Sequence, residues 1–346
     1  MANPHPAISA EAVAELPFVT VIMPIRNEAA YIAQSLGAVV AQTYPSDRLE
    51  IIISDGLSTD GTREIIQALA TPNLYLLDNP QKIVATGLNA AIHRAKGDII
   101  VRVDGHTIIE PDYVYQCVTA LKQSDAGNVG GPMRAIGKSL MAEAIALATS
   151  SPFGIGNSAF HYSDQEQFVD TVYMGAFPKQ LLFEVGLYNE KFVRHQDYEL
   201  NYRIRERNKK ILLTPKIRSH YYVRSSLPDL WRQYWQYGLW KGQFLRQHPG
   251  SWQFRHLVPP GFVAVGVVSM VSGVVLPGGR LLLAAVLLMY GLFLLTAVVH
   301  LSLKKSSLRY VFILPLSLSC LHISWGLGVW HGFLMGSSGL GEKPIS

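Results

Sequence analysis

The chain has little cysteine and no large excess of charge of one sign. Its 346 residues include only Cys117 and Cys320, one in each half, so a disulfide framework is excluded and a reducing compartment fits. The formal net charge of +5 is small and dispersed, so no nucleic-acid partner is expected. Residues 1–16 lack a basic segment followed by an apolar run, and we expect a flexible N-terminus rather than a cleaved signal.

Charge becomes scarce beyond Arg255. Residues 257–276 carry no charged side chain, and the runs 281–303 and 310–334 contain only histidines as basic groups. Each run reaches the length of about 20 residues that spans a bilayer core, which predicts three transmembrane helices within 257–335 and a short tail at 336–346. Basic residues precede the first run and follow the second, whereas Arg280 stands alone between them, so the N-terminal part is expected on the cytoplasmic side of the inner (plasma) membrane.

The N-terminal part alternates short β-branched runs with stretches of helical periodicity. Such alternation predicts an α/β domain whose mainly parallel sheet carries helices on both faces. We expect this domain to cover 17–226 and a membrane-proximal amphipathic helix to cover 227–256. The segment 150–163, rich in Ser, Gly and Pro, is predicted to be a loop over the crevice of the domain. The expected strands include 18–23, 49–54, 74–77 and 168–176, and the expected helices include 28–42, 60–70, 83–95 and 197–207.

Functional side chains follow three of the expected strands. The run that begins at Gly97 ends on Asp104 and His106, whose i, i+2 spacing suits one divalent cation. The other two runs end on Arg26 with Glu28 and on Asp55, and parallel strands bring their carboxyl ends to one edge. Two plainer interpretations stay open, because Glu28 is also a helix-capping residue type and Asp55-Gly56 is also a turn sequence.

Taken together, five segments resemble the nucleotide-sugar domain of family 2 glycosyltransferases. The resemblance covers about residues 17–249 and implies a GT-A type, Rossmann-like fold. It also implies transfer of a sugar, with inversion, from a nucleoside diphosphate donor. The segments are Pro24-x-Arg26-Asn27-Glu28, Asp55-Gly56-x-Ser58-Thr59-Asp60-Gly61-Thr62, Gly87-Leu88-Asn89, Ala95-Lys96-Gly97-Asp98 and Val103-Asp104-Gly105-His106.

The family pattern implies roles for individual residues of this domain. Asp104 matches the first aspartate of the D-x-D motif, which holds Mn²⁺ or Mg²⁺ on the diphosphate. His106 stands where the second aspartate is usual, and imidazole favours manganese over magnesium. The expected metal ligands are therefore Asp104 and His106. The expected nucleotide-sugar-binding residues are Pro24, Arg26, Glu28, Asp55, Lys82, Asn89 and Asp104.

The base of the reaction is expected downstream. The segment Gln196-Asp197-Tyr198-Glu199-Leu200-x-x-Arg203 resembles the family's E-D-x-E/D-L-x-x-R, in which the aspartate matching Asp197 takes the proton of the acceptor hydroxyl. Gln196 departs from the usual glutamate. On the residues alone, Asp197 and Glu199 could instead cap a helix and pair with Arg203.

The segment that follows resembles membrane-attached family members that build bacterial exopolysaccharides, including those of the succinoglycan type. The resemblance implies a UDP-sugar donor, with glucose the expected sugar, and a saccharide acceptor carried on polyprenyl diphosphate. It also implies contacts with membrane lipids and with other polysaccharide-assembly enzymes. Leu239 stands where the Q-x-x-R-W motif of processive synthases has arginine, which argues against such a synthase. Gln236, Trp240 and Lys241 are the expected acceptor or interface residues.

Two other functions remain open on the sequence. One lies in the same class, a processive polysaccharide synthase or a polyprenyl-phosphate sugar transferase. The other is a membrane protein that binds a nucleotide sugar without catalysis. Such a binder has no need of a base, so the joint presence of Asp104, His106 and Asp197 argues against it.

Overall fold

The computed structural model describes residues 15–69 and 71–335, and the chain divides into two compact units. Of the described residues, the first unit takes those up to 132 together with 164–219, and the second takes 133–163 and 220–335. This division differs from the single domain predicted for 17–226. The difference arises because Ala144, Ile145 and Ala148 bury their side chains in a cluster with residues of the C-terminal helices.

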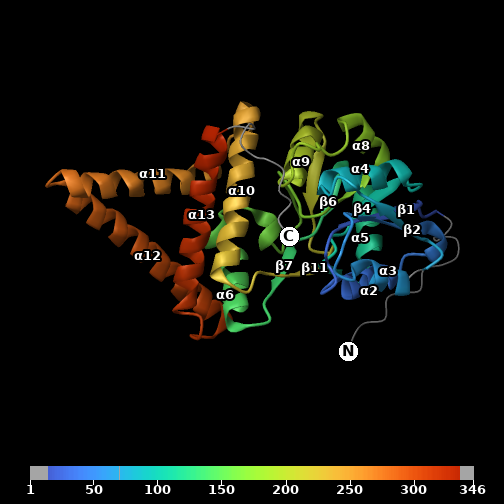
Figure 1. Ribbon diagram of the computed structural model, residues 1–346, viewed down its shortest axis with the longest axis horizontal. Coiled ribbons are helices and arrows are strands. Elements are labelled where there is room, and N and C mark those ends of the chain that lie inside the picture. Colours follow the sequence, from blue (N-terminus) through green and yellow to red (C-terminus); the bar gives the residue numbers. More distant parts are fainter. Residues whose placement is uncertain (1–14, 70, 336–346) are drawn as a thin grey trace. The chain divides into compact units, whose positions relative to one another are not determined.

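An eight-stranded sheet forms the first unit, in the order β3-β2-β1-β4-β9-β6-β10-β8 (Figure 1). The strands β3, β2, β1 and β4 run parallel, but β9 is antiparallel to both β4 and β6. The α/β fold with a mainly parallel sheet is confirmed, and β8 and β9 are its antiparallel strands. The bounds are β1 Val19–Ile25, β2 Leu49–Asp55, β3 Leu74–Asp78, β4 Ile99–Arg102, β6 Ala126–Gly130, β8 Gln167–Val169, β9 Ala176–Pro178 and β10 Lys210–Leu213.

Both faces of this sheet are covered, which explains why its strands are apolar without alternation. Val21 and Met23 of β1 belong to the main core with the apolar side chains of α2, whereas Ile22 between them points to the opposite face, since successive strand residues alternate. The helices of this unit are α2 Ile32–Val40, α3 Thr62–Ala68, α4 Val84–Arg94, α5 Tyr113–Gln123, α8 Lys179–Val185 and α9 Gln196–Glu206. Three short strands complete the chain order, β5 Thr107–Ile109, β7 Met133–Ile136 and β11 Ser219–Tyr222.

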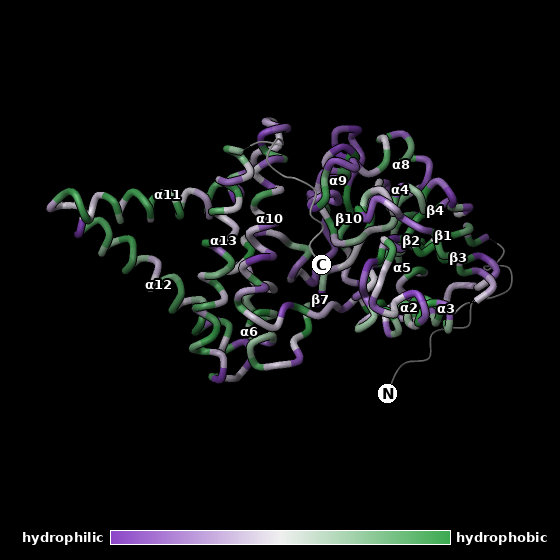
Figure 2. Tube along the Cα trace, in the orientation of Figure 1, coloured by the Kyte–Doolittle hydropathy of each residue, from purple (hydrophilic) through white to green (hydrophobic). Residues whose placement is uncertain are grey.

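The second unit is helical, and three of its helices are long and apolar enough to cross a membrane. Figure 2 shows α11 and α12 as almost continuously hydrophobic. Their large side chains face outward, with Val274 82% and Leu281 76% exposed, as lipid-facing residues would be. The helices of this unit are α6 Leu140–Thr149, α7 Pro152–Ile155, α10 Leu227–Gln247, α11 Phe254–Val275, α12 Gly279–Lys305 and α13 Ile313–Met335.

The prediction of a loop at 150–163 is wrong, because this segment contains α7 and a 3₁₀ turn at Ala159–His161. Ser151 accepts a hydrogen bond from the amide of Gly154, and Pro152 occupies the first helical position, so local capping stabilises the turn. The Phe153 carbonyl also accepts a hydrogen bond of 2.8 Å from His322 Nε2. The segment is therefore a packed part of the helical unit.

Candidate active site

The strand ends predicted to carry function do share one edge of the sheet. Strand β1 pairs with both β2 and β4, and Ile25 lies opposite Asp55 in the β1–β2 register. Arg26 and Glu28 follow β1 directly, and Asp104 follows β4 after one intervening residue. The chain therefore delivers basic and acidic groups to the same edge from three neighbouring strands.

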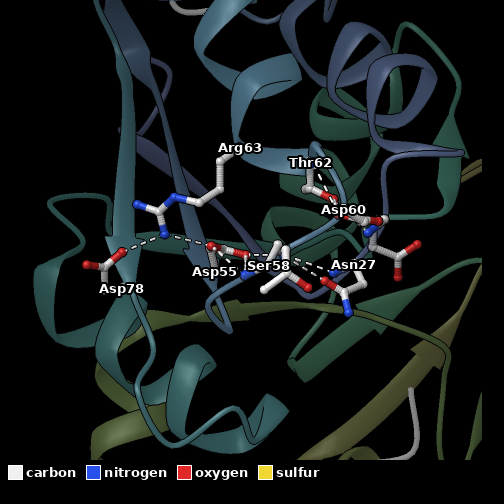
Figure 3. Close-up of polar contacts among 9 residues, drawn as sticks. Asn27, Asp55, Ser58, Asp60, Thr62, Arg63 and Asp78 are labelled. Atoms are coloured by element: carbon white, nitrogen blue, oxygen red, sulfur yellow. Dashed lines mark hydrogen bonds and ion pairs between the residues drawn. The ribbon is translucent and has the colours of Figure 1, made fainter.

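Asp55 is completely buried, and hydrogen bonds occupy both of its oxygens (Figure 3). The amide and hydroxyl of Ser58 donate to the carboxylate, and Arg63 Nη1 donates to Oδ2 at 2.7 Å. Arg63 also reaches Asp78 at 2.7 Å and so bridges the ends of β2 and β3. The turn interpretation of Asp55-Gly56 is thus realised, and the contact of Asp55 with a nucleotide base stays a prediction.

The loops after β1 and β2 hold each other in place. The Asn27 amide donates to Ser58 Oγ at 2.8 Å, and the Glu28 amide donates to Thr62 Oγ1 at 2.8 Å. Asp60 accepts from Thr62 and from the Ala29 amide, so both loops end in fixed turns. Asn27 adopts the left-handed conformation with φ of 54°, which asparagine tolerates better than most residues.

Two of the predicted ligand-binding residues are bonded to each other. Glu28 Oε1 lies 2.9 Å from His106 Nδ1, which joins the end of β1 to the turn after β4. A bond to Nδ1 fixes the ring orientation and assigns the acceptor lone pair of the neutral ring to Nε2. Glu28 thus supports the imidazole rather than capping a helix with its side chain.

Asp104 and Asp197 are linked by an arginine that sequence reasoning missed. Arg102 Nε donates to Asp104 Oδ1 at 2.8 Å, and Arg102 Nη1 forms an ion pair with Asp197 Oδ1. The Arg102 side chain is 4% exposed, against 15% for Asp104 and 25% for Asp197. A signal was present in the sequence, because an arginine inside the apolar run Ile99-Ile100-Val101-Arg102 needs buried partners.

Asp197 lies in the first turn of α9, in an environment suited to a proton acceptor. Burial raises the pKa of Asp197 to about 6, while the neighbouring Arg102 lowers it and Asp104 raises it. A carboxylate with a pKa near 6 is ionised at neutral pH and still basic enough to take a proton. The geometry therefore fits the expected role of Asp197.

Other polar residues of α9 hold the helix in position. Glu199, 1% exposed, accepts two hydrogen bonds of 2.7 Å from Arg203, which also donates to the carbonyls of Val185 and Leu187. Asn201 bonds Asn128 of β6 at 2.7 Å inside the core. The pairing of Glu199 with Arg203 is therefore structural, as the plainer interpretation proposed, while Asp197 turns to Arg102.

The remaining residues predicted to bind the nucleotide sugar divide into two groups. Pro24 is half-buried at the end of β1, and Lys82 is exposed in the turn after β3. Arg26 is half-buried beside Gly56, and its Nε is a buried donor without a hydrogen-bond partner among the described residues. Such an orphan donor at a strand end is a place for a ligand oxygen.

Asn89, also predicted to bind the nucleotide sugar, makes hydrogen bonds within the protein. Its amide donates to the Tyr188 carbonyl and to Glu190, both at 2.9 Å, and its oxygen accepts from the Tyr188 amide. These bonds attach α4 to residues 188–190, so the side chain is occupied by the protein itself. Asn89, Tyr188 and Glu190 also line a pocket of about 530 Å³ that extends to Asp78.

The residues predicted to face the acceptor or the membrane interface lie on α10. Trp240 is 9% exposed and Lys241 2% exposed, whereas Gln236 is half-buried. Both side chains are thus covered within the helical unit, and their role at an acceptor or interface stays a prediction. The cause is that α10 packs closely along α13, where an added Cβ on Gly238 would lie 2.2 Å from the Trp325 carbonyl oxygen.

The donor set can be tested against the metal that the fold implies. Among the residues described, no group of three or more His, Cys, Asp or Glu side chains is arranged to hold a metal ion. Asp104 and His106 supply two side chains, and His106 has the carboxylate partner that metal-binding histidines commonly show. Two protein ligands completed by phosphate oxygens and water are the usual arrangement for a nucleotide-bound Mg²⁺, so the residues fit a metal shared with a diphosphate.

Comparison with known proteins finds glycosyltransferases. Residues 20–180 match the model for "Glycosyl transferase family 2". The chain is 28% identical to the dolichyl N-acetyl-α-D-glucosaminyl phosphate 3-β-D-2,3-diacetamido-2,3-dideoxy-β-D-glucuronosyltransferase of Methanococcus voltae, over 93% of this chain and 98% of that protein. It is also 28% identical to the succinoglycan biosynthesis protein ExoA of Rhizobium meliloti, over 91% of this chain and 94% of that protein.

A solved structure shares the fold. The mannosyltransferase PcManGT of Pyrobaculum calidifontis, determined with GDP-Man and Mn²⁺, aligns with a TM-score of 0.55 and 20% identity. The alignment covers 89% of this chain and 87% of that protein. The GT-A type fold expected from the sequence is thereby confirmed.

Proposed function

Since this chain carries a family 2 glycosyltransferase domain, we propose that it is a membrane-bound, metal-dependent, inverting glycosyltransferase that moves a hexosyl group from a nucleoside diphosphate sugar to a lipid-linked saccharide. One observation carries this proposal, the meeting of Asp197 with Asp104 through Arg102 at the edge where β1, β2 and β4 end. A protein that only binds the donor would have no need of a basic carboxylate at this point.

The donor is held by groups that suit a diphosphate. Arg26 Nε is an unsatisfied donor at the end of β1, and the exposed ammonium of Lys82 follows β3. Both favour phosphate oxygens, which accept charge-assisted hydrogen bonds. We propose a uridine nucleotide, with glucose as the first sugar to test, and place the base beside the Arg63–Asp78 bridge because Asp55 is covered by Ser58 and Arg63.

Asp104 and His106 would hold the cation that the reaction uses. When bound, a divalent ion neutralises charge that develops on the leaving diphosphate. Glu28 keeps the His106 ring oriented, and Arg102 keeps one oxygen of Asp104 engaged. His106, which stands in place of the usual second aspartate, is thus paired with a neighbouring carboxylate.

The transfer then needs one proton acceptor. Asp197 removes the proton from the acceptor hydroxyl while that oxygen forms a bond to the anomeric carbon from the face opposite the diphosphate. The bond between the anomeric carbon and the diphosphate oxygen breaks, and its electron pair leaves with the nucleotide. The anomeric configuration is inverted, and Asp197 carries the proton away.

The acceptor is proposed to be a saccharide on a polyprenyl diphosphate at the membrane surface. The three long apolar helices support a membrane location, and the name of the Methanococcus voltae relative describes transfer to a dolichyl-linked sugar. Lys304 and Lys305 end α12 and Arg309 lies between α12 and α13, and such basic connections face the cytoplasm. We therefore propose an inner-membrane protein whose first unit is cytoplasmic, in exopolysaccharide or cell-surface glycan synthesis.

The test is transfer by the full chain in bilayer nanodiscs made with native lipid extract. UDP-glucose, UDP-N-acetylglucosamine and GDP-mannose are supplied separately with Mn²⁺ or Mg²⁺, and the lipid products are weighed by mass spectrometry. We expect one added hexosyl mass with a uridine donor and no product from Asp197→Asn. Products that grow by many sugars would indicate a processive synthase instead. Donor binding without any product in wild-type protein would contradict the proposed activity.

A further inference from the structure

Arg102 is a buried charge whose two partners come from distant parts of the chain. It ends β4, and its own amide donates to the Gly175 carbonyl at 3.0 Å, so the backbone at this position is fixed on the sheet. The guanidinium uses Nε for Asp104 and a different nitrogen, Nη1, for Asp197. Burying an arginine is costly unless it is paired, and here one cation is shared between two carboxylates.

An ordinary structural ion pair in the same unit gives a contrast. Arg203 pairs with Glu199 one turn earlier on its own helix and donates to two backbone carbonyls, which attaches α9 to the segment before it. Among the described residues, the Arg102 side chain donates to no backbone carbonyl, and its guanidinium carbon lies 6.0 Å from the centre of the Tyr188 ring. Its ion-pair partners are the carboxylate expected to bind metal and the carboxylate expected to take the proton.

We infer that Arg102 is a positioning residue of the transfer reaction, which holds Asp197 beside Asp104 and supplies the positive charge that lets the two carboxylates stay together. This inference rests on the proposed glycosyl transfer and adds a residue to it. Without Arg102, Asp104 and Asp197 would repel each other in a site that is largely shielded from water. The base would then leave the position from which it meets the acceptor hydroxyl.

Lysine cannot replace Arg102 in this role. The planar guanidinium presents separate nitrogens in a fixed fork, whereas an ammonium is a single point charge on a flexible stem. Arg102→Lys therefore keeps the positive charge but cannot bond Asp104 and Asp197 at the same time from two separate nitrogens. Arg26 and Lys82, the residues proposed to bind the donor, follow β1 and β3 rather than β4. The donor KM is therefore expected to change little.

The charge of Arg102 also has an effect that a merely structural residue would not have. Because the guanidinium already neutralises part of Asp104, its removal should increase the attraction of the site for a dication. We expect Arg102→Ala to bind Mn²⁺ about three- to tenfold more tightly in the absence of nucleotide, because the variant lacks one positive charge that repels the cation. Its kcat should fall about 100-fold, which is the cost of a misplaced catalytic group.

The experiment measures kcat, the donor KM and Mn²⁺ affinity by electron paramagnetic resonance, for full-length protein in nanodiscs. Arg102→Ala and Arg102→Lys are compared with Arg203→Ala, the matched loss of a buried pair on α9. We expect both Arg102 variants to have a lower kcat and a donor KM within about threefold of the wild-type value. Added guanidinium ion should raise the kcat of Arg102→Ala by at least about tenfold. No rescue is expected for Arg203→Ala.

Three results would overturn the inference. These are wild-type kcat in Arg102→Lys, loss of kcat without guanidinium rescue in folded Arg102→Ala, and weaker Mn²⁺ binding in that variant. If Arg102→Ala does not fold, Arg102→Lys decides through its kcat and donor KM. Failure of the proposed function gives a different result, because wild-type protein would then form no product with any donor. The Mn²⁺ affinities of wild-type protein and Arg102→Ala could still be compared.

Discussion

Glu28 and His106 form one unit across two strand ends, with Oε1 of the carboxylate 2.9 Å from Nδ1 of the ring. The contact depends on Gly105, because an added Cβ there would lie 2.8 Å from Ile25 Cγ2 and 3.1 Å from Glu28 Cγ. The glutamate side chain is 19% exposed and the histidine 43%, so the ring keeps access to solvent while its inner nitrogen is held. His106, which stands where the resembled pattern has its second aspartate, is therefore held by Glu28, a residue that belongs to the same pattern.

Loss of the Glu28 carboxylate should weaken metal use. Glu28→Gln removes the negative charge that orients His106, and changes of this kind typically cost 10- to 100-fold in metal affinity or activity. The measurement is the Mn²⁺ concentration that gives half-maximal transfer. Glu64→Gln, an exposed glutamate in the first turn of α3, is the control and should behave as wild type. An unchanged Mn²⁺ requirement in Glu28→Gln would show that the contact does not serve the metal.

Restoring the usual aspartate should change the metal preference. His106→Asp exchanges an imidazole for a carboxylate, and carboxylates suit magnesium while imidazole suits later transition metals. We expect the ratio of kcat/KM with Mn²⁺ to that with Mg²⁺ to fall by about tenfold, since oxygen ligands discriminate less between the two ions. The comparison is made at saturating metal. A ratio equal to that of wild type would remove His106 from the metal site.

The rate of transfer should fall in acid as Asp197 takes up a proton. Burial raises the pKa of this carboxyl to about 6, and only its ionised form can accept the proton of the acceptor. We expect kcat/KM to be flat above pH 7 and to drop about tenfold for each pH unit well below 6. Asp197→Asn should lose about 10²- to 10⁴-fold and lack this acidic limb. The same acidic limb in Asp197→Asn would mean that another group is the base.

Asn89 should matter for stability more than for donor binding. Asn89→Ala removes three hydrogen bonds that attach α4 to residues 188–190. We expect the free energy of unfolding of the first unit to fall by about 2–3 kcal/mol. Thermal unfolding followed by near-UV circular dichroism measures the loss. Glu190→Gln keeps an oxygen acceptor for Asn89 and should cost less than about 1 kcal/mol. A raised donor KM with unchanged stability would return Asn89 to the nucleotide site.

The strands up to β4 were predictable because each is a continuous apolar run that ends in a polar turn. Their register then follows from the parallel alternation of strand and helix, and with it the shared edge of Arg26, Asp55 and Asp104. The partnership of Arg102 was not predictable in this way. It needs β9, which enters the sheet antiparallel between β4 and β6, and α9, which follows later in the chain.

The segment 168–176 shows why local pattern was insufficient. Its apolar residues predicted one strand, but the structure divides them between β8 at the sheet edge and β9 in the middle. Met174 and Gly175 have φ of 58° and 109°, so the chain turns where the hydrophobic pattern continues. An added Cβ on Gly175 would lie 2.4 Å from Asn128 Oδ1, which explains the glycine by a contact distant in sequence.

The packing of α10 against α13 offers a prediction for the membrane unit. Gly238 and Gly242 of α10 lie against the backbone of α13, and Gly328 and Gly332 of α13 lie against the backbone of α10. An added Cβ on Gly332 would lie 1.9 Å from the Leu239 carbonyl oxygen. Small residues four apart on each helix allow such close approach of two backbones. Gly332→Ala must push the helices apart and should lower the stability of the second unit by about 1–3 kcal/mol, as overpacking does.

Gly291 supplies the matched control for this change, because it lies on the exposed helix α12 and an added Cβ there would meet nothing within 4 Å. Gly291→Ala should leave stability unchanged or raise it by up to about 1 kcal/mol, since alanine favours helix more than glycine does. Thermal unfolding in detergent, followed by helical circular dichroism, compares the two variants. Equal unfolding temperatures would show that the glycine faces of α10 and α13 do not govern their contact, and the buried state of Trp240 would then need another cause.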